Sequence, residues 1–448
     1  MAPILALLGL GACGARTGLE AAVTSSTPDA GAPRDAGRDA GAPCGPPAPE
    51  TCNRVDDDCD GRVDEELGFG ELRRVVVRDT QGTTGACSSC FWAAGPQVWL
   101  HDDGMLALWR MGFDGSRPMP NAWARRLDLD GTPRGEPFVL FDTRVPNGFR
   151  LAPIDGGRAA LGFCGRFGGD DVMTSAFVGP DGEVLVAPAR RQPMDVGCGA
   201  LHPDVTWSGE RALFSWIDNR GLAEGRAVLV DVTDRDGVGT GAGSALYEGS
   251  GDLSVPPRFA IGHGAVAMVT GHQPEPRVTR LAFVLYSLDG RERARQEFDA
   301  PPSTRWGITD VAASPDGWLV VGTDRTSFDE PTGRPTIRLD ADGGLVEGPL
   351  LVEPGYEWSV VELEPLPGGG FLLAGLLADP DGGEGVAVMR LDERGRRIDV
   401  WRPDPPTYFG LSGFDLVAQD GRVLLIYAGP AEDDAPNEVV LHELGCVE

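Results

Sequence analysis

Two series of tight-turn signals recur along this chain at nearly constant spacing, and this repeat constrains the fold more than any other feature. In the first series, a dipeptide such as Asp316-Gly317 separates an alternating segment from an apolar, β-branched run. Asp-Gly between apolar runs is a strong hairpin signal, because both central residues of a type I′ turn need positive φ. The first series is Asp103-Gly104, Asp155-Gly156, Ser208-Gly209, His263-Gly264, Asp316-Gly317, Gly368-Gly369 and Asp420-Gly421, at steps of 52 to 55 residues.

The second series of turns runs through the same units in the same order. Its members are Asp130-Gly131, Asp181-Gly182, Asp236-Gly237, Asp289-Gly290, Asp342-Gly343, Arg394-Gly395 and Leu444-Gly445, at steps of 50 to 55 residues. In residues 308–354 the two turns divide four strand-like segments: Asp310–Ser314, Trp318–Thr323, Thr336–Asp340 and Leu345–Val352. Seven such antiparallel units at this period predict a propeller or a solenoid.

The last unit distinguishes a propeller from a solenoid. Only three residues follow Leu444-Gly445, so the seventh unit lacks its fourth strand. The strand-like segment Glu71–Asp79 belongs to no unit, and adding it to the C-terminal unit closes a ring and removes an unpaired edge. We therefore predict an all-β fold, a seven-bladed β-propeller of four-stranded antiparallel blades over residues 70–448. Through its periodicity this region resembles bacterial β-propeller proteins, and it carries no WD or kelch signature.

Residues 1–12 form a short apolar run that ends in the tetrapeptide LGAC at Leu10–Cys13. This pattern resembles the signal peptide and lipobox of bacterial lipoproteins, although a chance apolar start is the alternative. The run is too short to span a bilayer as a helix. The resemblance implies export, acylation of Cys13, and a lipid anchor at the outer membrane or cell surface.

Residues 13–43 are of low complexity, with Asp-Ala-Gly repeats among prolines, and we expect a disordered linker. Residues 44–69 carry a cysteine- and aspartate-rich motif. Alternating carboxylates followed by Gly61 match the first half of an EF-hand loop, in which oxygen ligands surround calcium. The twelfth position is Leu67 rather than Glu, so the loop is not a complete EF-hand. The expected calcium ligands are Asp56, Asp58, Asp60, Asp64 and Glu65.

The same segment resembles the Asp-rich MopE-type metal-binding motif of bacterial surface proteins, on its Cys-Asn, Asp-Asp-Asp-Cys-Asp-Gly and Asp-Glu pattern. Some members of that group are labelled copper-binding. The hard carboxylate ligands here favour calcium instead, because copper prefers nitrogen and sulfur. The alternative is an acidic, disulfide-closed turn without a bound ion.

The chain has nine cysteines, and acylation of Cys13 leaves an even number. In an exported chain, an even number suggests disulfides. Cys87 and Cys90 have redox-motif spacing, but no strand–motif–helix context is visible, which favours a structural disulfide within a loop. From the rims on which the cysteines should lie, we predict Cys164–Cys198 on one rim and Cys44–Cys446 at the ring closure on the other. Cys52–Cys59 is predicted within the motif, which leaves Cys87–Cys90 as a local bridge.

The net charge of −29 argues against nucleic acid and anionic membrane surfaces as partners. All 39 basic residues are arginine, which excludes Schiff-base lysine chemistry and a phosphate-loop lysine. The five histidines are scattered along the chain with no second His or Cys at metal-ligand spacing, and no nucleophile elbow, zinc-helix motif or dinucleotide fingerprint is present, so no organic cofactor is expected. The tryptophans in strand-like runs are expected to pack between blades: Trp99, Trp109, Trp207, Trp216 and Trp318.

We expect ligands at the rim formed by the loops between the second and third strands of each unit. Arginine and carboxylate residues alternate there and could hold a sugar acid or a peptide, or could form a salt-bridged rim without a ligand. The candidate residues are Arg110, Arg166, Arg220, Arg325, Asp171 and Asp324.

The leading interpretation is a non-enzymatic, monomeric cell-surface lipoprotein, in which a calcium-binding stalk presents a propeller that binds a protein or glycan. The alternative is a secreted propeller hydrolase or lyase acting on extracellular polysaccharide. An enzyme would need arginine, histidine and carboxylate side chains that converge at one mouth of the channel. A structural envelope component, with a featureless rim, is the third interpretation.

Overall fold

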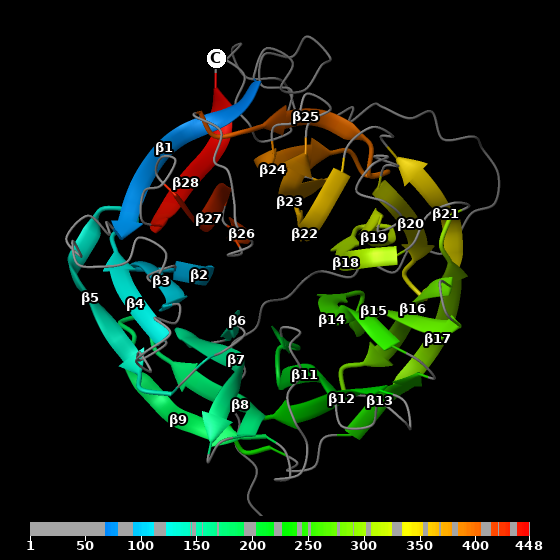
Figure 1. Cartoon of the computed structure of the whole chain (residues 1–448), viewed down its shortest axis with the longest axis horizontal. Coiled ribbons are helices and arrows are strands. Elements are labelled where there is room, and N and C mark those ends of the chain that lie inside the picture. Colours follow the sequence, from blue (N-terminus) through cyan, green and yellow to red (C-terminus); the bar gives the residue numbers. More distant parts are fainter. Residues whose placement is uncertain are drawn as a thin grey trace, which may run out of the picture. The chain divides into compact units, whose positions relative to one another are not determined.

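Seven four-stranded antiparallel sheets are arranged as blades around a central axis (Figure 1). A computed structural model describes the protein over residues 68–78, 93–111, 122–143, 145, 149–154, 156–167, 170–191, 203–218, 226–239, 244–249, 252–275, 278–289, 291–301, 306–324, 334–352, 357–366, 369–378, 384–404, 414–419, 421–430 and 437–447. Within these residues every regular element is a strand, and no helix is long and apolar enough to cross a membrane. The predicted seven-bladed β-propeller is confirmed.

The first six blades follow one another along the chain. Blade 1 contains β2 (Ala93–His101), β3 (Gly104–Met111), β4 (Ala122–Leu127) and β5 (Pro133–Phe141). Blade 2 contains β6 (Phe149–Ile154), β7 (Arg158–Phe167), β8 (Asp170–Val178) and β9 (Val184–Arg190). Blade 3 contains β10 (Asp204–Trp207), β11 (Ala212–Asp218), β12 (Arg226–Thr233) and β13 (Ser244–Gly249). Blade 4 contains β14 (Asp252–Gly262), β15 (Ala265–Glu275), β16 (Val278–Ser287) and β17 (Glu292–Asp299).

The remaining blades complete the ring. Blade 5 contains β18 (Trp306–Ser314), β19 (Gly317–Asp324), β20 (Arg334–Asp340) and β21 (Leu345–Val352). Blade 6 contains β22 (Glu357–Pro365), β23 (Phe371–Ala378), β24 (Glu384–Leu391) and β25 (Arg397–Trp401). Blade 7 contains β26 (Phe414–Gln419), β27 (Arg422–Pro430), β28 (Asn437–Val447) and β1 (Gly68–Arg78). The first strand of each of these seven sets lies nearest the axis and contacts its counterparts in the two adjacent blades.

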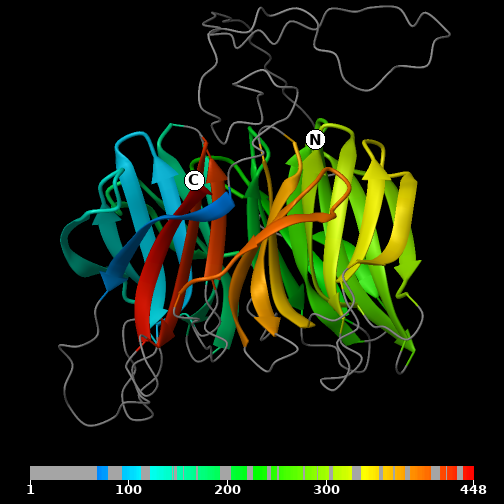
Figure 2. The ribbon, with the colours of Figure 1, turned by 90° about the horizontal axis from the view of Figure 1, so that it is seen from above.

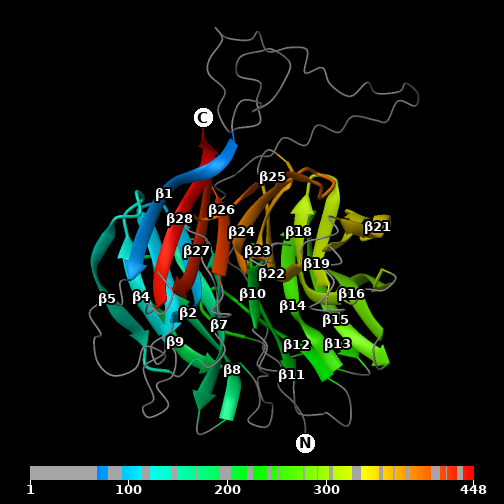
Figure 3. The same cartoon turned by 45° about the horizontal axis from the view of Figure 1, so that its top comes forward.

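The predicted donation of an N-terminal strand to the last blade is also confirmed. β1 pairs antiparallel with β28 (Figures 2 and 3). This register places Arg74 opposite His442 and Val76 opposite Val440. The strand begins at Gly68, three residues before the predicted start. Because β1 covers the outer edge of blade 7, the N-terminal and C-terminal segments close the ring together.

A closure latch of Glu71, His442 and Tyr427 joins β1, β28 and β27. His442 Nδ1 lies 2.6 Å from the Glu71 carboxylate, and its Nε2 lies 3.0 Å from the Tyr427 hydroxyl. The His442 side chain is 1% exposed. Burial lowers the pKa of His442, whereas the Glu71 carboxylate opposes that shift. The latch therefore gives a buried imidazole two polar partners at the point where the ring closes.

The hydrophobic core consists of seven layers, one at each interface between adjacent blades. Side chains alternate between the two faces of a strand with a period of two. In β19, for example, Trp318 and Val320 pack toward blade 4, whereas Leu319 and Val321 pack toward blade 6. Both faces of each blade are therefore buried, which explains why the second strands read as continuous apolar runs.

The second series of turns differs from the two-residue type I′ loops expected from the sequence. In blade 5, Gly343 donates its N–H to the Asp340 carbonyl at 3.0 Å and has a φ of 84°. This is a type I turn followed by a glycine in the left-handed region. The Asp340 carboxylate stabilises it by accepting the N–H of Asp342 at 3.0 Å. In the first series, His263 and Gly264 have φ of 52° and 64°, as a type I′ turn requires, but Asp103 and Asp316 do not have positive φ. The two-residue loops of blades 1 and 5 are instead Asp102-Asp103 and Pro315-Asp316, because Gly104 and Gly317 already pair with His101 and Ser314, so the type I′ prediction is wrong there.

Candidate functional site

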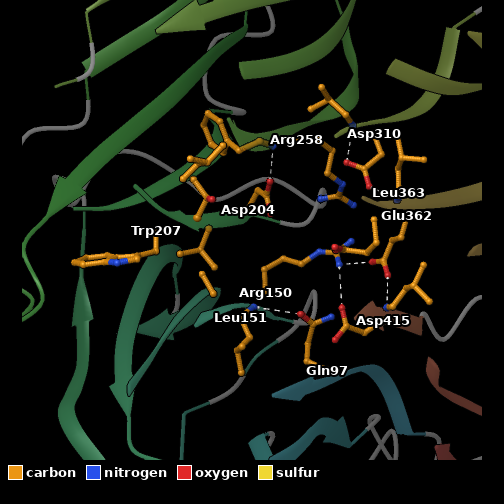
Figure 4. A pocket seen from close by; sticks show the side chains of 18 of the residues that line it. Gln97, Arg150, Leu151, Asp204, Trp207, Arg258, Asp310, Glu362, Leu363 and Asp415 are labelled. Atoms are coloured by element: carbon orange, nitrogen blue, oxygen red, sulfur yellow. Dashed lines mark hydrogen bonds and ion pairs between the residues drawn. The ribbon is translucent and has the colours of Figure 1, made fainter. Parts of the chain in front are cut away.

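A polar cavity of about 310 Å³ lies between the axis-facing strands of the seven blades (Figure 4). One polar residue from the first strand of each blade lines it, at equivalent positions that are 52 to 54 residues apart along the chain. We call these seven residues the channel ring. In blade order they are Gln97, Arg150, Asp204, Arg258, Asp310, Glu362 and Asp415.

Five members of the channel ring tie adjacent blades together through hydrogen bonds. Each of these side chains accepts the backbone N–H of the residue that follows the ring member of the next blade. The five contacts, at 2.8 to 3.2 Å, join Asp415 to Val98, Gln97 to Leu151, Asp204 to Phe259, Asp310 to Leu363, and Glu362 to Leu416. These carboxylates and the Gln97 amide therefore have a structural role, because they satisfy strand N–H groups that face the channel.

The two arginines of the ring break this pattern, because a guanidinium has no hydrogen-bond acceptor. Blade 5 follows Arg258, and its Val311 N–H donates instead to the Asp310 carboxylate of its own blade at 2.8 Å. Arg150 and Arg258 extend from blades 2 and 4 toward the same part of the cavity (Figure 4). The ring thus places two positive groups in the channel that do not connect adjacent blades.

Arg150 reaches across the channel and pairs with carboxylates of two distant blades. Its Nη1 donates a hydrogen bond to Glu362 and lies 3.9 Å from an Asp415 oxygen. Burial alone would lower the pKa of Arg150, but the carboxylates of Glu362, Asp204 and Asp415 outweigh it and raise the pKa above its ordinary value. Arg150 is therefore a firmly charged member of an ion-pair network.

Arg258 is 5% exposed but is not paired in this way. Among the described residues, its Nε and Nη1 atoms have no hydrogen-bond partner. Burial is the main cause that lowers the pKa of Arg258, and the positive charge of Arg150 lowers it further. Asp204, Asp310 and Glu362 attract the guanidinium from a distance and oppose these two effects.

Three carboxyl groups in the cavity bind their protons more tightly than usual. Burial raises the pKa of Asp310 to about 7, and Arg258 opposes the rise. Burial also raises the pKa of Glu364, and the nearby carboxylates of Asp310 and Asp415 add to the effect. For Asp415, burial and then the Glu362 carboxylate raise the pKa well above its ordinary value. Near neutral pH the cavity is therefore less negative than its five carboxyl groups would suggest.

The ligand-binding candidates expected on the rim can be compared with the lining of this cavity for one residue, and that residue is not part of the lining. Arg110 is the one candidate whose side chain is described. It is the last residue but one of β3, and burial lowers its pKa, but it does not line the cavity. Arg166, Asp171 and Asp324 lie in β7, β8 and β19, without described side chains. Arg220 and Arg325 lie outside the described residues. A ligand role for this rim stays a prediction.

The prediction that the tryptophans pack in the core is confirmed for four residues, whereas the fifth also lines the cavity. Trp99, Trp109, Trp216 and Trp318 are at most 3% exposed and pack within or between blades. Trp207 packs partly against the core layer between blades 2 and 3, but it also lines the cavity. Trp207 is therefore available to a ligand as well as to the core.

No histidine is among the described residues that line the cavity, so the structure does not bring arginine, histidine and carboxylate together there. The calcium-binding candidates Asp56, Asp58, Asp60, Asp64 and Glu65 lie outside the described residues, as does Cys13. Within the part of the chain that is described, no group of His, Cys, Asp and Glu could hold a metal ion.

The described cysteines test the predicted disulfides only in part. Cys164 is buried in β7 and is disulfide-bonded, but its predicted partner, Cys198, lies outside the described residues. Cys446 lies in β28 opposite Phe69 of β1, beside the closure where its pairing was expected. The remaining cysteines, Cys44, Cys52, Cys59, Cys87 and Cys90, are not described, so all four pairings stay predictions.

Comparisons with known proteins establish the fold and no more. No family model matches the sequence, and no curated protein matches it. A protein of unknown function from Dyadobacter fermentans is similar with a TM-score of 0.50 and 14% identity, over 85% of this chain and 100% of that one. The polysaccharide lyase Uly1 is similar with a TM-score of 0.52 and 9% identity, over 84% of this chain and 100% of that one.

A prolyl endopeptidase has a TM-score of 0.48 at 15% identity, and the match covers 78% of this chain and 46% of that enzyme. At such low sequence identities, a shared propeller fold is no evidence that two proteins share an activity. The function must therefore be inferred from the cavity itself.

Proposed function

We propose that this protein is a non-enzymatic ligand-binding propeller, which takes one small group of a glycan or protein into the channel cavity. The observation that supports this proposal is that the members of the channel ring have two different structural roles. Five members tie blades together, whereas Arg150 and Arg258 extend into the cavity. A concave site with a few convergent polar groups is the usual form of a binding site. The volume of about 310 Å³ suits one small unit.

The N-terminal segments would hold this propeller at the cell surface. The LGAC pattern at Leu10–Cys13 supports lipid anchoring, and the composition of residues 13–43 supports a flexible linker. The carboxylates between Asp56 and Glu65 support a calcium-binding stalk next to the propeller. Replacement of Cys13 with serine should move the protein from the membrane fraction to the soluble fraction, and retention in the membrane fraction would contradict the anchor.

Trp207 and Trp123 provide a matched pair for testing the cavity as the binding site. Both indoles are half-buried, but only Trp207 lines the cavity, whereas Trp123 packs against the core layer between blades 7 and 1. Ligands are first identified by applying the full chain to glycan panels and secreted proteins. We expect W207A to weaken the captured interaction by about tenfold or more, as for buried aromatic anchors in general, and W123A to leave it unchanged. Equal effects of both substitutions would argue against the cavity.

A hydrolase or lyase acting on polysaccharide is the second candidate, and the raised pKa of Glu364 favours it. Burial raises the pKa of Glu364 well above its ordinary value, and a general acid must keep its proton near neutral pH. The test is incubation of extracellular polysaccharides with the wild type and E364Q, followed by product sizing. The binding proposal predicts no turnover by either protein. Turnover by the wild type that is lost in E364Q would replace it with the enzymatic function.

A further inference from the structure

Arg258 is the group in the cavity whose bonding is least complete. It occupies the same ring position as the five blade-tying side chains, and its guanidinium lines the cavity. It is 5% exposed, and its Nε and Nη1 atoms have no hydrogen-bond partner among the described residues. Arg150, at the equivalent position two blades away, pairs with Glu362 and Asp415. Since buried polar groups in proteins are nearly always paired, an unpaired arginine of this kind indicates a missing acceptor.

The carboxyl groups of the cavity do not supply this acceptor. Asp204 and Asp310 are held by the backbone N–H groups of Phe259 and Leu363, at 2.9 and 2.8 Å. Asp310 also accepts the Val311 N–H through its other oxygen. Their positions are therefore fixed by the sheet, and neither forms an ion pair with Arg258 within the described residues.

An anion in the cavity would also reduce the repulsion between the two arginines. Arg150 and Arg258 approach the same part of the cavity, and the charge of Arg150 disfavours the charged form of Arg258. Three of the surrounding carboxyl groups, Asp310, Glu364 and Asp415, have raised pKa values because they are buried. A carboxyl group with a raised pKa carries less negative charge at a given pH, so it repels an entering anion less.

We propose that the cavity binds the carboxylate of an acidic sugar, with Arg258 as the residue that pairs with it. This proposal rests on the proposed glycan-binding function and specifies the kind of glycan. A carboxylate matches a guanidinium in charge and geometry. Sugar hydroxyls are donors that suit the acceptor-rich ring, and Trp207 adds an aromatic surface. A peptide C-terminus offers the carboxylate but not the hydroxyls, so a sugar fits the cavity better.

The experiment compares ligands that differ in one group, by isothermal titration calorimetry on the full chain. The probes are glucuronate, its methyl ester, glucose and N-acetylglycine. The wild type is compared with R258M, which removes the charge but keeps a similar length, and with R258K, which keeps the charge. The matched control is R291M, because Arg291 is 86% exposed and lies outside the cavity. The methyl ester tests the ligand carboxylate on unaltered protein, whether or not R258M folds.

We expect the wild type to prefer glucuronate over glucose and over the methyl ester by about tenfold or more, which is typical of a charge-assisted pair. R258M should lose this preference, R258K should keep part of it, and R291M should keep all of it. If glucose and glucuronate bind equally, or if R258M keeps the preference, the acidic-sugar proposal fails while glycan binding stands. N-acetylglycine binding as tightly as glucuronate would also overturn the proposal, in favour of a peptide carboxylate. If no saccharide binds, the glycan function itself fails.

Discussion

Asp310 titrates inside the channel, so replacing it with asparagine should change how the stability of the protein depends on pH. Burial raises the pKa of Asp310 from its ordinary value of 3.8 to about 7 in the folded protein. A group whose folded pKa is raised contributes stability that is complete below its unfolded pKa and is lost as the pH rises through its folded pKa. Asp310 should therefore destabilise the folded state progressively between the pH values of 3.8 and about 7.

The size of this effect follows from the width of that window. Each unit of pKa difference corresponds to about 1.4 kcal/mol. Between about pH 5 and about pH 8, roughly two units lie below the folded pKa, which corresponds to about 3 kcal/mol. Asp310 is half-buried rather than fully buried, and partial exposure reduces the effect. We therefore expect a loss of about 1.5 to 3 kcal/mol from this residue.

D310N removes the titration but keeps an oxygen for the Leu363 N–H, which Asp310 accepts at 2.8 Å. The second acceptor, used by the Val311 N–H, is lost, and this cost does not depend on pH. The net charge of −29 also makes stability depend on pH, but it does so in both proteins. The difference between the two pH profiles therefore isolates Asp310.

The measurement is urea unfolding of the full chain at about pH 5 and about pH 8, followed by tryptophan fluorescence. Between these conditions the wild type should lose about 1.5 to 3 kcal/mol more stability than D310N. D316N is the control, because Asp316 is an exposed carboxylate at the turn that follows the same strand, and it should behave like the wild type. Parallel profiles for the wild type and D310N would refute the argument that Asp310 titrates near neutrality.

Three further predictions test other parts of the account. E71A should lower the free energy of unfolding by about 1 to 3 kcal/mol, because it removes the carboxylate that lies 2.6 Å from the buried His442. It should also expose β1 to proteolysis, and unchanged proteolysis would contradict the latch. W318A should cost about 3 to 5 kcal/mol in urea unfolding, because Trp318 is 1% exposed in the layer between blades 4 and 5, and a loss below about 1 kcal/mol would be inconsistent with that packing. In calorimetry, the full chain should bind calcium and D58N should not; calcium heat that survives in D58N would remove Asp58 from the ligand set.

The number of blades and the mode of closure could be predicted because both are encoded locally. Tight turns repeat at a fixed step, and Glu71–Asp79 is a strand pattern without a unit. The type of the second turn was predicted wrongly, because Asp-Gly alone does not show that Asp340 caps a longer loop through its side chain. A dipeptide signal locates a turn more securely than it defines the conformation.

The channel ring could have been found in part. A polar residue stands four to six positions before each turn of the first series, within a strand that is otherwise largely apolar. Because binding residues are expected on loops more than on strands, this pattern does not by itself indicate a site. Arg150 has ion-pair partners, whereas Nε and Nη1 of Arg258 have no hydrogen-bond partner among the described residues. This difference arises only when the ring is assembled, so no local sequence pattern could predict it.

A crystal structure of the full chain grown with glucuronate would show whether the channel cavity binds a ligand. We expect density for the sugar between the axis-facing strands, with its carboxylate at hydrogen-bonding distance from Arg258. Density confined to the loops between the second and third strands, with an unchanged cavity and an unpaired Arg258, would contradict it.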